Sequence, residues 1–181
     1  MVYVFFAEGF EEVEALTAVD LIRRSGADLK TVSVMGTRKV KGSHDIPIET
    51  DLLFEEVCMP AQMLVLPGGM PGTKNLKAHE GLCRLLEKQY MAGGWLAAIC
   101  AAPSVFAELG FLKGKKATSY PGAVAEEDCG KYLEEEVVMD GNLITSRGVG
   151  TAIPFALKLI ELLKDKDTAD RIASSIIYRR N

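Results

Sequence analysis

The sequence predicts an α/β fold in which a mostly parallel β-sheet is covered by helices on both faces. Short uninterrupted apolar runs alternate along the chain with stretches of helical periodicity. Such runs are typical of strands buried on both faces, and their alternation with helices favours parallel strand pairing. The 181 residues, 48% of them hydrophobic, are enough for one core, so a single domain over residues 1–181 is expected.

The first strand is expected over residues 2–6, and the first helix follows it. Glu11 and Glu12 suit the positive end of that helix, and Gly26 suits its end. The apolar residues that recur at helical spacing are expected to form its inward face: Val13, Leu16, Val19 and Ile22.

The later strands share an apolar run bounded by glycine, proline or asparagine, and are expected at 29–35, 63–66, 95–99, 117–118, 137–139 and 143–145. The last two of these flank Asp140–Asn142, which is typical of a hairpin turn. A polar ribbon is expected over residues 36–48 and a solvated acidic face over 126–136. Helices are expected over 80–91, after Pro103, over about 151–164 and at the end of the chain.

Charge and cysteine usage exclude several functions. The 21 basic and 25 acidic side chains give a formal charge of −4 without a long basic run, so neither nucleic acid nor an anionic membrane is an expected partner. No stretch resembles a signal peptide or a membrane span. The four cysteines show neither metal-ligand spacing nor a disulfide framework, which favours a cytoplasmic protein: Cys58, Cys83, Cys100 and Cys129.

A buried strand is predicted to end abruptly at Cys100. Trp95–Ile99 is an apolar run, and Pro103 suits the first turn of a helix, where the N–H that proline lacks has no partner. Cys100 is therefore expected on a tight turn, with the small residues Ala98 and Ala102 allowing strand and helix to approach closely. A reactive thiol and a buried structural cysteine both fit this stretch alone.

Other candidate residues follow the ends of predicted strands, where α/β sheets bind ligands. The amides of Gly68 and Gly69, with that of Ala101, would form an oxyanion hole; an ordinary glycine turn is the alternative. Glu14 lies one turn inside the first helix. It points either to solvent or across the end of the sheet toward Cys100.

Histidine is scarce in this chain, although cysteine hydrolases usually pair the thiol with one. His44 and His79 are both expected at the surface, and two isolated histidines predict no metal site. No cofactor is expected either. Tyr120 is a candidate for the pocket wall and Arg147 for binding an acidic group, although a structural role fits each of them equally well.

Five motifs in one order span almost the whole chain: Glu11–Glu14, Val19–Gly26, Val65–Gly69, Ala97–Pro103 and Thr145–Thr151. On these motifs the sequence resembles the ThiJ/PfpI superfamily, in the branch that includes the parkinsonism-associated protein deglycase (DJ-one) and bacterial YajL. The resemblance implies a flavodoxin-like three-layer α/β/α sandwich with a nucleophile elbow, similar to class I glutamine amidotransferases. It also implies a homodimer.

The resemblance assigns roles to the candidate residues. Cys100 corresponds to the reactive nucleophile and Glu14 to the carboxyl that contacts it. Gly68, Gly69 and Ala101 then line the oxyanion pocket. The helix N-terminus would lower the pKa of Cys100 below the free value of about 8.5, provided that Glu14 is protonated and donates to the thiolate.

Three positions depart from the family pattern. Ala101 replaces the histidine that follows the cysteine in peptidase-like members, which argues against a cysteine–histidine peptidase. Tyr120 replaces a pocket histidine of the parkinsonism branch, so Glu14 is expected to carry the proton transfer. His44 replaces an arginine of the ribbon, which implies different dimer contacts.

The function that the resemblance implies is a cofactor-independent glyoxalase or deglycase of the carbonyl and oxidative stress response. Its substrates would be methylglyoxal-type dicarbonyls or the adducts that these form on proteins. A redox-sensing holding chaperone, acting through oxidation of Cys100, is the alternative from another class. A role in thiamine biosynthesis and a cysteine peptidase activity are weaker alternatives.

Overall fold

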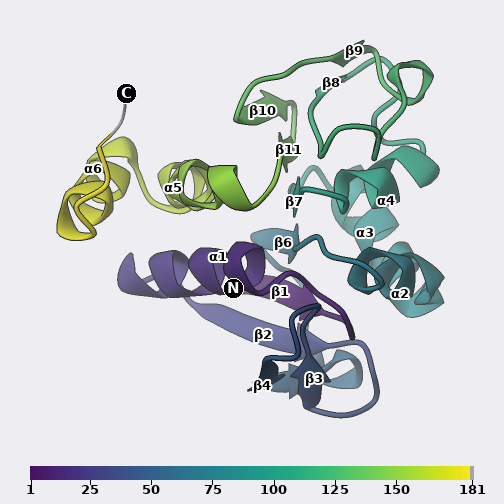
Figure 1. Ribbon diagram of the computed structural model, residues 1–181, viewed down its shortest axis with the longest axis horizontal. Helices are drawn as coiled ribbons and strands as arrows, with labels where there is room; N and C mark the ends of the chain where they lie inside the picture. The colour runs from purple at the N-terminus through teal and green to yellow at the C-terminus, as the bar shows by residue number, and fades with distance from the viewer. Residues whose placement is uncertain (180–181) are drawn as a thin grey trace.

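The computed structural model describes residues 1–179 and is built on a seven-stranded sheet (Figure 1). The strands run in the order β10-β11-β7-β6-β1-β2-β5, and all neighbours are parallel except β10 and β11. The bounds are β1 (Val2–Phe6), β2 (Leu29–Ser33), β5 (Leu52–Leu53), β6 (Met63–Leu66), β7 (Trp95–Ile99), β10 (Val137–Asp140) and β11 (Leu143–Ser146). The predicted mostly parallel sheet is confirmed.

Helices cover both faces of this sheet, as the apolar runs of the strands require. They are α1 (Glu12–Arg24), α2 (Gly72–Ala78), α3 (Glu80–Met91), α4 (Pro103–Glu108), α5 (Ala152–Leu163) and α6 (Lys166–Ser175). Figure 1 shows α1, α5 and α6 on one side and α2, α3 and α4 on the other. Within residues 1–179, no helix has both the length and the hydrophobicity needed to cross a bilayer.

The alternation of side chains along β1 divides the core into two layers. Phe6 packs with Ile22 and Phe155 on the face covered by α1 and α5. Phe5 packs on the opposite face, which Phe106 of α4 helps to cover. Because both faces of the sheet are buried, the molecule is a three-layer α/β/α sandwich with a flavodoxin-like arrangement.

The buried face of α1 differs from the predicted one. Val19 and Ile22 are buried as expected, but Val13 is 47% exposed and Leu16 38% exposed, so the prediction for these two residues is wrong. The small residue Ala15 is buried instead, where α1 packs against α5. Close packing of two helices favours a small side chain at the contact, and this requirement outweighs the greater hydrophobicity of leucine.

The remaining elements are short and lie outside the main sheet. The predicted ribbon forms from β3 (Lys39–Lys41) and antiparallel β4 (Pro47–Glu49), and β8 (Lys116–Ala117) pairs with β9 (Lys131–Tyr132). Single turns of 3-10 helix occur at η1 (Phe54–Glu56), η2 (Glu126–Asp128) and η3 (Val149–Thr151). The hairpin predicted around residues 140–142 joins β10 to β11.

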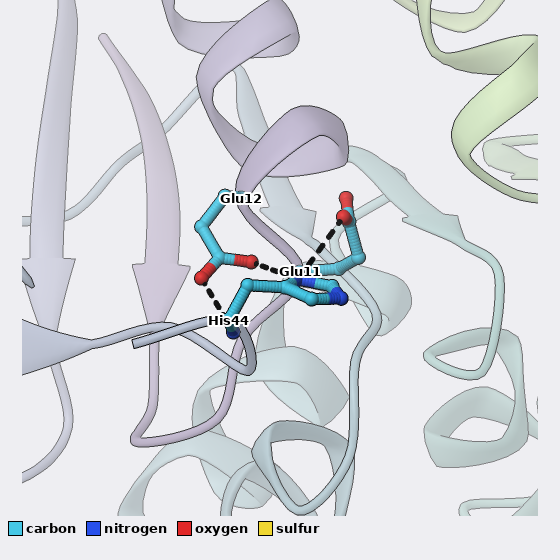
Figure 2. Close-up of side chains that lie close together, drawn as sticks. All are labelled: Glu11, Glu12 and His44. Atoms are coloured by element: carbon cyan, nitrogen blue, oxygen red, sulfur yellow. Dashed lines mark hydrogen bonds and ion pairs between the residues drawn. The ribbon is translucent and has the colours of Figure 1, made fainter. Parts of the chain in front are cut away.

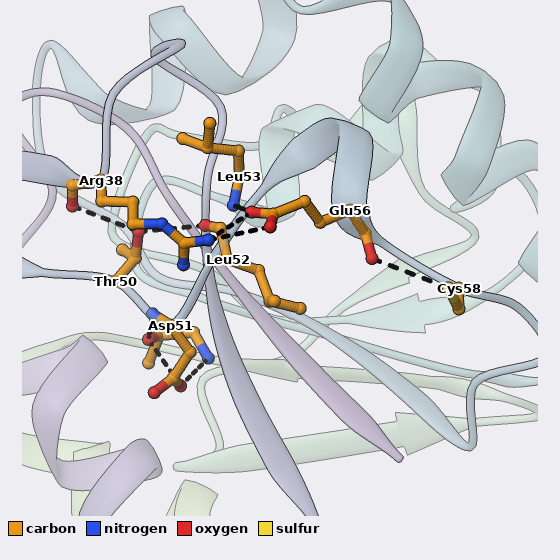
Figure 3. A network of polar contacts seen from close by, with 8 residues as sticks. Arg38, Thr50, Asp51, Leu52, Leu53, Glu56 and Cys58 are labelled. Carbon is orange, nitrogen blue, oxygen red and sulfur yellow. Dashed lines mark hydrogen bonds and ion pairs between the residues drawn. The ribbon is translucent and has the colours of Figure 1, made fainter.

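A polar network holds the ribbon beside the edge strand β5 (Figure 3). The Arg38 guanidinium donates to both carboxylate oxygens of Glu56 at 2.8 and 2.7 Å, and the Leu53 amide donates to Glu56 Oε2 at 2.7 Å. The amide of Thr50 donates to the carbonyl of Arg38 at 2.9 Å. Exposed ion pairs contribute little free energy, so this network mainly fixes the position of the ribbon.

Candidate active site

The strand register brings three loops to one edge of the sheet. Leu66 of β6 is level with Ala98 of β7, and Ser146 of β11 is level with Ile99. The chain therefore leaves β6, β7 and β11 at the same height, and Cys100 is the first residue after β7. This is the edge at which parallel sheets bind their ligands.

Cys100 occupies a strained turn between β7 and α4. Its φ of +64° lies in the left-handed region, which a non-glycine residue adopts at a cost of about 1–3 kcal/mol. The Cys100 amide donates to the Ser146 carbonyl at 3.0 Å, and the Tyr120 amide donates to the Cys100 carbonyl at 2.8 Å. The predicted elbow is present, with Ala98 and Ala102 fully buried beside it.

Gly68 allows the loop after β6 to touch the elbow. A Cβ atom at this position would lie 2.7 Å from Cys100 Cβ and 2.7 Å from Glu14 Oε2, closer than real Cβ contacts. The Gly68 amide donates to Glu14 Oε2 at 3.0 Å. This differs from the expected oxyanion role, because a donor already engaged by a carboxylate is not free to stabilise an oxyanion.

The amides that face the sulfur belong to Gly69 and Ala101. Burial raises the pKa of Cys100, and the hydrogen bonds that both amides donate toward the sulfur oppose that rise by favouring the thiolate form. The predicted oxyanion pocket therefore has two free backbone donors, one from each of the loops after β6 and β7. Two such donors are a typical oxyanion hole.

Glu14 points across the end of the sheet rather than to solvent. It is 1% exposed, contacts Cys100 by a hydrogen bond, and leaves Oε1 without any hydrogen-bond partner. Its helix is held in register by the cap, in which the Glu14 amide donates to Glu11 Oε2 at 2.7 Å. Burial raises the pKa of Glu14 to about 7, although hydrogen bonds from Cys100 and Gly68 favour the charged form.

The thiol behaves differently from the expectation. Burial, the charge of Glu14 and the hydrogen bond to Glu14 raise the pKa of Cys100 to about 12, where a lowered value was predicted. The N-terminus of α4 does not offset these effects, because Cys100 lies two residues before the N-cap residue Ala102 and the dipole acts only close to the end of the helix. Glu14 and Cys100 titrate as one pair that retains a single proton between about pH 7 and pH 12.

Tyr120 and Gly148 complete the wall of the pocket. A Cβ atom on Gly148 would lie 3.8 Å from Glu14 Oε1, 3.8 Å from Tyr120 Cδ2 and 3.9 Å from Cys100 Sγ. The sequence indicated Tyr120 for this position but did not single out Gly148. In the sequence, only its place in the Thr145–Thr151 motif pointed to Gly148 as a residue of the site.

The structure supports a structural role for His79 but shows no partner for the Nη1 atom of Arg147 among residues 1–179. Arg147 is half-buried. His79 caps α3, where its Nδ1 accepts from the Leu82 amide at 3.0 Å, and its ring lies edge-on to Phe54. His79 therefore acts as a helix cap, which agrees with its predicted place at the start of a helix.

A second cluster of titratable groups lies at the N-terminus of α1 (Figure 2). His44 Nδ1 lies 2.8 Å from Glu12 Oε2 and 3.9 Å from Glu11 Oε1, and the His44 amide donates to Glu12 Oε1 at 2.7 Å. Their ligand atoms approach closely enough to share a metal ion. In this structure the three residues tie the ribbon to α1, a contact that the sequence did not predict.

Comparisons with known proteins identify the family to which this chain is related. The model of the DJ-1/PfpI family matches residues 1–162. Protein DJ-1beta of Drosophila melanogaster is 39% identical over 181 residues, which cover 98% of this chain and 97% of that protein. A Pyrococcus abyssi protein named as a deglycase is 30% identical over 167 residues, covering 90% of this chain and 99% of that protein.

Protein DJ-1 homolog A of Arabidopsis thaliana is 38% identical over 184 residues, and the match covers 99% of this chain. It covers 47% of the Arabidopsis protein, so the chain spans about half the length of that relative. The crystal structure of Drosophila melanogaster DJ-1beta matches with a TM-score of 0.93 at 38% identity, over 99% of this chain and 98% of the other. The chain therefore belongs to the DJ-1/PfpI family.

Proposed function

We propose that this protein is a cofactor-independent glyoxalase and deglycase that acts on methylglyoxal-type dicarbonyls and their protein adducts. The observation that carries the proposal is the placement of the buried Glu14 carboxyl against Cys100, with the backbone amides of Gly69 and Ala101 facing the sulfur. The relative named as a deglycase supports the class of activity.

The first step is addition of the Cys100 thiolate to the aldehyde carbon of methylglyoxal. The pair supplies the thiolate when its single proton resides on Glu14. The amides of Gly69 and Ala101 stabilise the oxyanion of the hemithioacetal, which then takes up a proton.

Glu14 then moves a proton between the two carbons. Once ionised, it removes the proton from the former aldehyde carbon and returns it to the adjacent carbon through an enediol, which gives a thioester. Water hydrolyses the thioester to lactate and frees the thiolate. With a protein adduct, the same thiolate attacks the hemiaminal carbon, the carbon–nitrogen bond breaks, and the amine leaves with the proton that Glu14 donates. The product is the same hemithioacetal.

The test is lactate formation by the purified protein supplied with methylglyoxal alone. Turnover without added cofactor is the expected result, and mild peroxide pretreatment should abolish it, because an oxidised thiol cannot add to the aldehyde. Absence of lactate from the fully reduced protein would overturn the proposed activity.

Redox sensing is the second candidate function, favoured by the state of the cysteines. Cys58, Cys83, Cys100 and Cys129 are all free. Peroxide is therefore expected to take Cys100 past sulfenic acid to sulfinic acid, which intact-mass measurement detects. Suppression of client aggregation by the oxidised protein alone would support this function, whereas a dominant Cys100 disulfide would contradict it.

A homodimer is part of the proposal, supported by the exposed apolar residues of α1. Val13 and Leu16 leave a hydrophobic strip on a helix whose other face is buried. Light scattering should give twice the chain mass, and Leu16→Asp should yield monomers. Met91→Asp, on an exposed residue of α3, is the control that should stay dimeric; a monomeric parent protein would contradict the proposal.

A further inference from the structure

A groove opens beside the nucleophile between α2 and the loop after β8. Its volume of about 370 Å³ lies in the range of about 300–1,000 Å³ typical of ligand pockets. Ala101, whose amide faces the sulfur, and Tyr120, whose ring borders the catalytic pocket, both line it. The groove is thus continuous with the site of thiol addition, and it is much larger than the three carbons of methylglyoxal require.

The charges along the groove have one sign. Lys74 and Lys77 of α2 line it one helical turn apart, and none of its described lining residues is acidic. Lys77 pairs with Glu108 at 3.2 Å, but the side chain of Lys74 forms no ion pair or hydrogen bond with any of residues 1–179. An unpaired cation in a groove beside a nucleophile attracts the negative end of a substrate.

We infer that this groove binds an anionic group at the remote end of the substrate. The preferred substrates are then α-oxoaldehydes, or adducts of them, that carry a carboxylate or phosphate away from the reacting carbonyl. Lys74 contacts that group, and Tyr120 and Met70 pack along the connecting chain. This inference rests on the proposed function for the reaction, although the groove itself can be tested without turnover.

The first experiment compares two substrates of equal chain length. One is γ,δ-dioxovalerate, which ends in a carboxylate, and the other is propylglyoxal, which ends in a methyl group. Lys74→Glu should lower kcat/KM for the anionic substrate roughly fivefold to tenfold and leave the neutral one within about twofold, the effect of reversing an exposed charge at the groove. The loss should shrink as ionic strength rises.

Two variants control for net charge and for folding. Lys88→Glu makes the same charge change on α3, outside the groove, and should leave both substrates unaffected. Lys74→Arg keeps the cation and should retain the preference. A phosphate-ended α-oxoaldehyde, assayed in parallel, shows which anion the groove prefers. Equal losses in Lys74→Glu and Lys88→Glu, or no loss in either, would overturn the inference.

The second experiment separates the groove from the reaction. Maleimidopropionate and N-ethylmaleimide both alkylate thiols, but only the first carries a carboxylate. The ratio of their rates at Cys100, followed by peptide mass spectrometry, should fall about fivefold in Lys74→Glu and stay constant in Lys88→Glu. This result with no lactate formation would uphold the groove and reject the proposed activity. An unchanged ratio, or no labelling of Cys100, would reject the groove.

Discussion

Glu12 and Glu14 lie two residues apart on α1, yet their surroundings push their pKa values in opposite directions. Glu12 meets His44: although burial raises its pKa, hydrogen bonds from the side chain and backbone of His44 lower the pKa of Glu12 to about 2. Glu14 faces the Cys100 thiol and the Gly68 amide, and burial raises the pKa of Glu14 to about 7. One carboxylate is thus fixed as a charge and the other is available for proton transfer.

Depth of burial and hydrogen bonding both separate the two carboxyls, because burial dominates at Glu14 and hydrogen bonds outweigh it at Glu12. Glu12 is 4% exposed and Glu14 1% exposed, so both are removed from water. Both oxygens of Glu12 accept hydrogen bonds, whereas Glu14 has Gly68 on one oxygen and no hydrogen-bond partner on the other. At Glu14 burial destabilises the anion more than the hydrogen bonds from Cys100 and Gly68 stabilise it, and a carboxyl whose pKa lies near 7 suits a general base at neutral pH.

The largest expected effect is that of removing the thiol. Cys100→Ser should reduce lactate formation at least about 100-fold, because a serine hydroxyl beside Glu14 is a much weaker nucleophile. Cys83→Ser removes a half-buried thiol of α3 and should retain full activity. Turnover by Cys100→Ser in the coupled lactate assay would contradict the role of Cys100 as the nucleophile and leave the redox function as the candidate.

Removing the base should come next in size. Glu14→Gln keeps the shape and the contact with Gly68 but cannot accept the carbon proton, so lactate formation should fall by about 100-fold or more. Thiol addition remains available, so intact-mass measurement should detect an accumulated hemithioacetal. Glu12→Gln is the matched control and should retain turnover. Full activity in Glu14→Gln would show that another group is the base.

Stability should depend on pH with opposite signs at the two carboxyls. The folded pKa of Glu14, about 7, exceeds the ordinary 4.5, so the folded state binds the extra proton and stability falls between these values as pH rises. Glu14→Gln should remove that loss and be more stable at pH 8, on the order of 3 kcal/mol. Urea unfolding at pH 5 and pH 8 measures this difference in the free energy of unfolding. An equal change between the two pH values in both proteins would contradict the raised pKa of Glu14.

Glu12 should behave in the reverse sense. Its folded pKa of about 2 lies below the ordinary 4.5, so its contribution is present above pH 4.5 and is lost as pH falls toward 2. Glu12→Gln should therefore cost on the order of 2 kcal/mol at pH 7, with a discount for the solvent exposure of His44. The same urea series measures it, and a cost that persists at pH 2 would contradict this origin.

The smallest effect is expected at His44. The hydrogen bond and charge of Glu12 raise the pKa of His44, so its stabilising contact is complete below the ordinary value of 6.5 and is lost as pH rises through the folded pKa. His44→Ala should lower Tm at pH 6 by a few degrees at most and leave Tm at pH 9 unchanged. A pH-independent difference would indicate a packing role instead.

The sequence predicted the parts that depend on local pattern. The strands that end at Leu66 and Ile99 are apolar runs, and the elbow at Cys100 follows from the small residues and Pro103 around it. The exposed Leu16 could not be predicted, because packing of α1 on α5 decides which side of the helix is buried.

The polar contacts of the site could not be predicted from the local sequence for a similar reason. His44 meets Glu12 across 32 residues of chain, and Glu14 takes the Gly68 amide across 54. Both contacts depend on side-chain conformers that the assembled sheet selects. The contact with His44 lowers the pKa of Glu12, whereas burial raises the pKa values of Glu14 and Cys100. The sequence therefore located the candidate base but predicted the wrong direction for the pKa of the Cys100 thiol.

Carbon-13 NMR of the side-chain carboxyls, recorded on protein labelled at glutamate across a pH series, tests the contrast between Glu12 and Glu14 most directly. Glu12→Gln and Glu14→Gln assign the two resonances. We expect a midpoint near 7 for Glu14 and one near 2 for Glu12. Cys100→Ser should move only the first. A Glu14 carboxyl that titrates at 4.5 or below would contradict its role as the base that shares a proton with Cys100.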